Sequence, residues 1–287
     1  MTTAPPNRDM AGSDPAAGGG LYTRLHDDAA GSCRLGSDEV HLWYAAAGRA
    51  QTPAPMKAYE SLLSVDELAR MRRFVDSRDR QTFLVSHALL RATLSRYLPV
   101  RAHHWRFVTG EKGKPRIAAD QGCATGVEFS LSHTRGFAVL GVARGREIGV
   151  DVECLRRQFD LSVAEDFFAA DEVAALRAAD AAAQQELFVG LWTLKESYLK
   201  ATGAGLSTAL DTISFRCEAE KVIATGPRDA ADRWSFWQFR PTVDHLCSLC
   251  VQASRDQVIR LRVMGCLPLC NEWLAGWPVT RTSRAGR

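Results

Sequence analysis

Apolar and polar positions alternate between strand-like and helix-like patterns along the first part of the chain. Val40 to Tyr44 form a short run rich in β-branched and aromatic side chains, which is typical of a strand. Ser64 followed by Glu67 is a capping-box sequence and predicts the start of a helix. A longer helix is predicted over residues 79–97. This part of the chain therefore combines helices with strands.

The same mixture continues to the C-terminal part of the chain. Further strands are predicted over residues 104–108, 127–131, 136–142, 148–152, 212–217, 233–240, 245–251 and 257–263. Two Ala-rich segments predict helices over residues 162–183 and 184–201. Both halves then join helices to a sheet, which favours an α+β fold of two pseudo-symmetric subdomains over a doubly wound sheet.

The composition of the two ends suggests where the subdomains begin and end. Residues 1–35 collect prolines and the run Gly18 to Gly20 among small polar residues, so we expect a disordered tail. The N-terminal subdomain is then predicted over residues 36–145 and the C-terminal subdomain over residues 146–277. Residues 278–287 are predicted to be a flexible tail.

Composition and charge narrow the class of protein. The chain has 287 residues, of which 46% are hydrophobic and 24% charged, as in ordinary globular proteins. Its 36 Lys and Arg against 33 Asp and Glu give a net charge of +3, too weak to indicate nucleic-acid binding. No apolar run reaches the roughly 18–20 residues of a membrane span, and the first residues lack a signal-peptide pattern. We expect a cytoplasmic protein that binds neither nucleic acid nor a membrane.

A pair of carboxylates is the first candidate for chemistry. In the predicted strand Gly149 to Glu153, side chains two residues apart share a face, so Asp151 and Glu153 lie side by side. Such a pair repels itself unless a cation lies between, and Mg²⁺ is the usual occupant of oxygen-only sites. The alternative is a solvent-facing edge of a half-buried strand.

The predicted helix over residues 184–201 offers a second candidate. Trp192, Glu196 and Lys200 recur every four residues and therefore line one stripe of the helix. Gly203 and Gly205 are natural helix stops. The alternative is an exposed Glu196–Lys200 pair, which contributes only a few tenths of a kcal/mol.

A loop and the end of a predicted strand supply the remaining candidate polar groups. The segment Gly110 to Pro115 is Gly-rich and basic, and Lys114 with backbone N–H groups suits a phosphate. Its spacing excludes a Walker A loop, and a charged hairpin turn explains it equally well. Ser132 and His133 end an alternating strand; as sequence neighbours they do not indicate a Ser-His-Asp triad, and a polar strand end at a binding site fits better.

The joint occurrence of these motifs in order carries a family resemblance. Over about residues 60–210 the chain resembles the Sfp-type 4′-phosphopantetheinyl transferases, through Lys114-Pro115, Ser132-His133, Asp151-x-Glu153 and Trp192-x-x-Lys195-Glu196-x-x-x-Lys200. The resemblance implies the fold of that family. It also implies transfer of 4′-phosphopantetheine from coenzyme A to a serine of an apo acyl or peptidyl carrier protein, with release of adenosine 3′,5′-bisphosphate.

The resemblance further implies roles for individual residues. Asp151, Glu153 and Glu196 would ligate Mg²⁺, Glu196 would also accept the serine proton, and Lys200 would stabilise charge on the pyrophosphate. The coenzyme A contacts implied are Arg70, Thr82, Lys114, Pro115, Ser132, His133, Lys195 and Lys200. Glu67 stands where relatives often carry a basic residue. One chain contains both halves, so a monomer would suffice.

Two alternative functions remain open on the sequence alone. A Mg²⁺-dependent phosphoesterase acting on a nucleotide-type pyrophosphate needs the same carboxylates and basic residue, with water in place of the carrier serine. A zinc-stabilised binding module would use Cys247, Cys250, Cys266 and Cys270. Cys247 and Cys250 fall on a predicted strand, where residues three apart face opposite sides, so buried thiols are the favoured interpretation.

Overall fold

The computed structural model describes most of the chain after residue 32. The described residues are 33–49, 53–110, 113–122, 126–205, 210–226, 232–254, 256–269, 273–274 and 276–284. The tail predicted over residues 1–35 lies almost wholly outside them; of its last residues, Leu35 is buried. Among the described residues, no helix combines the length and apolar character needed to cross a membrane.

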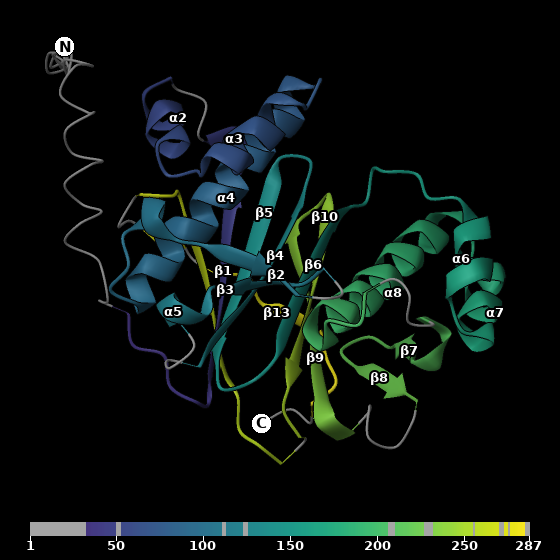
Figure 1. Cartoon of the computed structure of the whole chain (residues 1–287). Coiled ribbons are helices and arrows are strands. Elements are labelled where there is room, and N and C mark those ends of the chain that lie inside the picture. The colour runs from purple at the N-terminus through teal and green to yellow at the C-terminus, as the bar shows by residue number, and fades with distance from the viewer. Residues whose placement is uncertain are drawn as a thin grey trace, which may run out of the picture.

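A five-stranded sheet with helices on one face forms the first half (Figure 1). The strand order is β12-β11-β1-β5-β4, all pairs being antiparallel except β1 with β11. Its strands are β1 (Glu39–Ala46), β4 (Val127–Thr134), β5 (Phe137–Arg144), β11 (Arg260–Cys266) and β12 (Trp273–Leu274). The accompanying elements are α2 (Pro53–Glu60), α3 (Val65–Arg72), α4 (Ser77–Tyr97), α5 (Ala119–Gly122) and the hairpin of β2 (Phe107–Thr109) and β3 (Pro115–Ile117).

The second half has a four-stranded antiparallel sheet of order β13-β9-β10-β6, covered by one long helix. Its strands are β6 (Ile148–Cys154), β9 (Trp234–Thr242), β10 (His245–Gln252) and β13 (Val279–Thr282). The other elements are α6 (Leu161–Phe167), α7 (Ala170–Ala178), α8 (Ala181–Thr202) and the hairpin of β7 (Ser214–Cys217) and β8 (Val222–Thr225). Figure 1 shows α8 along this sheet with α6 and α7 at its outer side. Each half thus joins a long helix to a sheet, which confirms the predicted α+β class.

Three apolar clusters divide these elements into layers. Trp43 and Leu89 belong to the cluster between α4 and the first sheet. Leu42 and Val150 belong to the cluster between the two sheets, and Leu194 belongs to the cluster between α8 and the second sheet. Successive side chains of β1 and β6 point to opposite faces of their sheets, so each strand contributes to the layer on either side of it. The order of layers is therefore helix, sheet, sheet, helix.

Two strands differ from the sequence-based expectation because their pairing partners are distant in the chain. Residues 260–266, predicted for the second subdomain, form β11, which pairs in parallel with β1 of the first sheet. Residues 279–282, predicted as part of a flexible tail, form β13 at the edge of the second sheet, where they pair with β9. Backbone pairing across the edge supplies hydrogen bonds that composition alone does not reveal.

Local helix capping explains why one predicted helix is divided in the structure. The helix predicted over residues 162–183 is two short helices, α6 and α7, and α8 already begins at Ala181. The Asp160 carboxylate accepts from Ser162 N at the start of α6, and the Asp180 carboxylate accepts from Ala183 N at the start of α8. Asp at an N-cap satisfies free backbone donors, so each Asp starts a new helix. The strand predicted over residues 104–108 also differs. Residues 102–104 form a 3₁₀ turn, and the strand that follows is β2, over Phe107–Thr109.

The edges of the two sheets meet at β4 and β6. Ser130 Oγ accepts from Val150 N at 3.0 Å, and Ser132 Oγ accepts from Val152 N at 3.4 Å. These hydroxyls take the place of a neighbouring strand's carbonyls for the edge of β6. On the face of β6 that packs against α8, a Cβ at Gly149 would overlap Ser197 O and Ala201 N, so only glycine lets the helix lie this close to the strand. The candidate site forms at this junction.

Candidate active site

Asp151 lies at the centre of the junction. Its side chain faces α8 from β6, and only 4% of the residue is exposed. Asp151 Oδ1 accepts from Ser132 Oγ at 2.8 Å and from Lys200 Nζ at 2.6 Å. Asp151 Oδ2 is buried and has no hydrogen-bond partner. A buried carboxylate oxygen without a donor is costly, so this atom indicates a place for a cation or a donor from a ligand.

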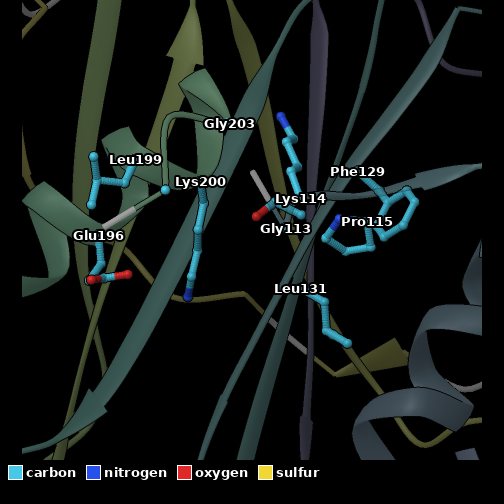
Figure 2. Close-up of a pocket in the computed structure, with 11 residues that line it drawn as sticks. Gly113, Lys114, Pro115, Phe129, Leu131, Glu196, Leu199, Lys200 and Gly203 are labelled. Atoms are coloured by element: carbon cyan, nitrogen blue, oxygen red, sulfur yellow. The ribbon is translucent and has the colours of Figure 1, made fainter. Parts of the chain in front are cut away.

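Helix α8 brings two further predicted residues to Asp151. Glu196 and Lys200 are one turn apart and both partly exposed, and Figure 2 shows their side chains next to one another. Lys200 Nζ also donates to Ser132 Oγ at 3.0 Å. The sequence prediction that Glu196 and Lys200 share a stripe is confirmed, and the stripe faces β6 and β4.

The carboxylates influence one another electrostatically. Burial, followed by the charge of Asp151, raises the pKa of Glu153 to about 7, with Arg157 and Lys200 acting in the opposite direction. Burial and then Asp151 also raise the pKa of Glu196, opposed by Lys200. Thr134 Oγ1 donates to Glu153 Oε2 at 3.4 Å. Positive charge added between these groups would relieve their repulsion.

The donor atoms are of the type that a hard divalent cation such as Mg²⁺ prefers. All three predicted ligands, Asp151, Glu153 and Glu196, offer carboxylate oxygens, and Asp151 Oδ2 lacks any other partner. Within the described part of the chain, however, no three Asp, Glu, His or Cys side chains are gathered closely enough to form a complete metal cage. Lys200 holds Asp151 instead.

A cavity of about 340 Å³ adjoins this cluster (Figure 2). The end of the β2–β3 hairpin, strand β4 and the end of α8 form its walls, so both halves contribute. The lining residues are Gly113, Lys114, Pro115, Phe129, Ser130, Leu131, Glu196, Leu199, Lys200, Gly203 and Gly205. Phe129, Leu131 and Leu199 make part of this lining apolar, while Glu196 and Lys200 add charge to it.

A second cavity, of about 560 Å³, is lined by two of the other predicted binding residues, Thr82 and His133, and by the predicted metal ligand Glu153. Thr82 Oγ1 donates to Arg78 O and accepts from Gly136 N, at 2.9 and 3.0 Å. His133 is exposed, yet nearby protein desolvates it, and this effect together with the charges of His87, Lys200 and Arg70 lowers its pKa to about 4. Glu153 thus borders this cavity as Glu196 borders the first.

Arg70 and Glu67 lie on α3, and neither is among the residues that line the second cavity. Arg70 is exposed, and its guanidinium carbon is 5.7 Å from the centre of the Phe83 ring. Glu67 points inward instead and pairs with Arg91 Nε at 2.8 Å. The acidic residue at this position therefore has a structural partner within the first half.

Lys195 contradicts the prediction that it contacts coenzyme A. Its side chain is 0% exposed and pairs with Glu172 Oε2 at 2.7 Å. Lys195 Nζ also donates to Leu210 O and Ile213 O, at 2.7 and 2.6 Å. One residue before Glu196, it lies on a different face of α8, since successive residues are about 100° apart around a helix.

Lys114 and Pro115, for which the resemblance implies contacts with coenzyme A, both line the first cavity, but the ammonium group of Lys114 is turned away from the charged cluster. In Figure 2 the ammonium groups of Lys114 and Lys200 point in opposite directions. Phe129, Leu131 and Leu199 line the cavity but were not among the predicted site residues. The apolar alternation along 127–131 was the signal available for the first two.

The three described cysteines of the proposed zinc set do not converge. Cys247, Cys250 and Cys266 belong to three different apolar clusters, and Cys270 lies outside the described residues. Cys247 and Cys250 face opposite sides of β10, as the strand period requires. Burial raises the pKa of both thiols, which suits structural cysteines rather than metal ligands.

Comparison with known proteins connects this geometry to one family. Residues 147–250 match the model described as 4′-phosphopantetheinyl transferase superfamily, and residues 51–144 match the model of the N-terminal part of 4′-phosphopantetheinyl transferases. The two matches together span the β4–β6 junction and α8.

Individual relatives agree with the family models. The 4′-phosphopantetheinyl transferase HetI of Nostoc sp. is 39% identical over 172 residues, which cover 60% of this chain and 71% of the relative. The transferase Sfp of Bacillus subtilis is 33% identical, over 55% of this chain and 68% of its own length. A solved holo-(acyl-carrier-protein) synthase from Bacillus anthracis has weaker similarity, with 19% identity and a TM-score of 0.33 over 38% of this chain and 96% of its own. On the family models and these relatives, the chain belongs to the 4′-phosphopantetheinyl transferase family.

Proposed function

We propose that this enzyme transfers 4′-phosphopantetheine from coenzyme A to a serine of an apo carrier protein and releases adenosine 3′,5′-bisphosphate. The observation that carries the proposal is the buried, unpartnered Asp151 Oδ2 beside Glu153, Glu196 and Lys200, at a cavity formed by both halves. Transfer at a pyrophosphate needs positive charge around the phosphates and a base near the incoming hydroxyl. Membership of the transferase family supports this choice.

The three carboxylates would hold the Mg²⁺ ion. Asp151, Glu153 and Glu196 are the ligands proposed, and the bound ion would neutralise charge on the pyrophosphate oxygens. Lys200 is placed to act beside it, because its ammonium already reaches both Asp151 and Ser132, at 2.6 and 3.0 Å. Released from Asp151 Oδ1, the same ammonium can stabilise negative charge on the phosphate that becomes the leaving group.

Glu196 is the proposed base for the carrier serine. Burial and the charge of Asp151 raise the pKa of its carboxyl, which increases its affinity for a proton. It lies at the cavity wall, where the incoming hydroxyl can reach it directly or through one water. Glu196 then holds the proton at a carboxylate oxygen while the serine oxygen forms its bond to the phosphorus that carries the pantetheine. The bond from that phosphorus to the bridging oxygen of the pyrophosphate breaks, and this oxygen leaves as part of adenosine 3′,5′-bisphosphate.

Recognition of coenzyme A falls to residues of the first half. Pro115, Phe129 and Leu131 provide an apolar wall suited to the adenine ring. His133 and Arg70 would provide imidazole and guanidinium donors for the phosphates. The hydroxyls of Ser132 and Thr82 would join them only after giving up their bonds to Asp151 Oδ1 and Arg78 O. With a pKa of about 4, His133 is neutral near pH 7, so it would donate a hydrogen bond rather than a charge.

The proposed partner and setting follow from the reaction. An apo acyl or peptidyl carrier protein is the second substrate, and one chain supplies every residue of the proposed site, so a monomer is sufficient. A cytoplasmic location, where coenzyme A and Mg²⁺ are both present, is part of the same proposal.

Intact-protein mass spectrometry tests the proposal. An apo carrier protein would be incubated with the enzyme, coenzyme A and Mg²⁺, alongside a reaction containing EDTA. We expect the carrier to gain one phosphopantetheine group, and EDTA to prevent the gain. Cleavage of coenzyme A without a modified carrier would instead establish the phosphoesterase alternative.

A further inference from the structure

The ammonium of Lys114 is fully occupied within the protein. Lys114 Nζ donates to Glu147 Oε2 at 2.6 Å, to Ile148 O at 3.2 Å and to Ala201 O at 3.0 Å. A lysine ammonium has three donors and no acceptor, so these bonds use all of them. The side chain is only 8% exposed. No donor remains for a phosphate unless one of these bonds breaks.

The three acceptors belong to the elements that carry the active site. Glu147 and Ile148 stand at the start of β6, which carries Asp151 and Glu153. Ala201 is in the last turn of α8, which carries Glu196 and Lys200. The final carbonyls of a helix lack internal partners and favour a cation, so Lys114 caps α8 from another element. One side chain therefore joins the β2–β3 hairpin to both catalytic elements.

Glu147 holds the hairpin through a second residue as well. Its Oε1 accepts from Arg116 NH2 at 2.7 Å, while its Oε2 accepts from Lys114. Burial raises the pKa of Glu147, but the hydrogen bonds from Arg116 and Lys114 outweigh this effect and lower it overall. Glu147 therefore stays ionised near neutral pH and binds two cations of the hairpin at once.

The hairpin needs such an attachment because it has little pairing of its own. Strands β2 and β3 have three residues each and form a separate two-stranded sheet, which is marginal without other support. Gly113, Lys114 and Pro115 form one wall of the 340 Å³ cavity. The position of that wall depends on what fixes the hairpin to β6 and α8.

We propose that Lys114 and Glu147 form a latch that fixes the β2–β3 hairpin against β6 and α8, and that Lys114 is a positioning residue rather than a phosphate ligand of coenzyme A. The part concerning coenzyme A rests on the proposed function. The latch itself concerns only contacts within this chain.

Steady-state kinetics with two substrates separate positioning from direct contact. Lys114→Met and Glu147→Gln would be compared with wild type on coenzyme A and on 3′-dephospho-coenzyme A. We expect each variant to raise KM by about ten-fold for both substrates, because the cavity wall loses its position, while kcat changes less than about three-fold. The double variant should be no worse than either single variant, since both remove the same latch.

Direct contact gives a different pattern. If Lys114 binds the 3′-phosphate, Lys114→Met should raise the KM for coenzyme A but leave the KM for 3′-dephospho-coenzyme A unchanged. A Lys114 that binds the pyrophosphate would make the effects of Lys114→Met and Glu147→Gln additive. Either result overturns the proposal. Glu128→Gln is the matched control, because Glu128 pairs with Arg116 at 3.0 Å but does not contact Lys114; its KM should stay within about two-fold of wild type.

Hydrogen exchange provides a readout that is independent of activity. Exchange of the amides over residues 107–117 should be faster in Glu147→Gln than in wild type or Glu128→Gln, while exchange over β10 is unchanged. Unchanged exchange over the hairpin in Glu147→Gln would refute the latch even in an active enzyme. Conversely, a wild-type protein without transferase activity would refute the proposed function and leave this exchange test in force.

Discussion

Two lysines of α8, five residues apart in the sequence, each pair with a carboxylate, and the two pairs have different surroundings. Lys195 and Glu172 are both 0% exposed and lie 2.7 Å apart in the apolar cluster between α8 and the second sheet. Lys200 and Asp151 lie 2.6 Å apart at the junction of the sheets, where the Lys200 side chain is 31% exposed. The first pair faces the core and the second faces the proposed substrate.

Hydrogen bonding distinguishes the pairs further. Glu172 accepts from Lys195 and from the backbone N–H groups of Ala169 and Phe215, so both of its oxygens have partners. Asp151 keeps one oxygen without a partner, although it is almost as deeply buried. A fully satisfied buried pair fixes a structure, whereas an incompletely satisfied one is poised to bind. The comparison indicates that saturation of donors and acceptors, more than burial, separates structural from functional charges here.

The largest expected effect comes from breaking the core pair. Lys195→Met leaves the Glu172 carboxylate buried without its cation, which should lower the free energy of unfolding by about 3–5 kcal/mol. Urea denaturation measures this loss. The double variant Lys195→Met with Glu172→Leu should recover much of it, and a double variant as unstable as Lys195→Met alone would contradict the assignment.

Breaking the junction pair should affect activity more than stability. Lys200→Met removes the cation proposed to stabilise the leaving phosphate, so kcat/KM should fall by about 100- to 1,000-fold. Asp151 is buried but keeps the hydrogen bond from Ser132 Oγ, and the Lys200 side chain is partly exposed, so the free energy of unfolding should fall by less than in Lys195→Met. Near wild-type kcat/KM in Lys200→Met would remove this lysine from the mechanism.

A buried carboxylate of the first half extends the comparison to pH. Burial raises the pKa of Glu67, but hydrogen bonds from His87 and Arg91 outweigh it and lower the pKa from the usual 4.5 to about 2. The folded state thus binds this proton less readily than the unfolded state does. The resulting stability, on the order of 3 kcal/mol, is present above pH 4.5 and is lost as the pH falls towards 2.

Urea denaturation of wild type and Glu67→Gln at several pH values tests this. The difference between the two proteins should be largest near pH 6 and should shrink steadily below pH 4.5. A difference that stays constant over this range would show that Glu67 acts through packing rather than through its charge.

The smallest expected effect concerns the contact that positions both lysines. A Cβ in Gly149→Ala would overlap Ser197 O and Ala201 N, so α8 must shift away from β6 at a cost of about 1–3 kcal/mol. Because Lys200 faces β6 and Lys195 faces away from it, transfer activity should fall more than stability alone explains. The check is kcat/KM measured well below the unfolding temperature of the variant. Wild-type kcat/KM there would mean that the position of α8 on β6 is unimportant.

The sequence predicted the local parts of this picture well. Strand period placed Asp151 and Glu153 on one face, and helix period placed Glu196 and Lys200 on one stripe. The same helix period puts Lys195 on a different face, yet the family motif grouped it with the site; its partner Glu172 is 23 positions earlier in the chain, and no local pattern links them.

The parts that the sequence did not predict depend on distant segments. β11 pairs with β1 more than 200 residues away, and Lys114 finds its acceptors on β6 and α8. Contacts of this kind depend on how whole layers pack. They cannot be predicted from local sequence, because every residue has a backbone carbonyl and nothing distinguishes Ala201 O from the others. The sequence therefore predicted residues of the proposed site but not the attachments that hold its walls.

The central claim is that the Asp151 side of α8 carries out phosphopantetheine transfer. The most direct test follows the mass of an apo carrier protein over time with coenzyme A and Mg²⁺, using wild type, Asp151→Asn and Lys200→Met at temperatures where each is folded. We predict complete modification by wild type and modification slower by at least about 100-fold with either variant. Equal rates for all three folded proteins would contradict the account.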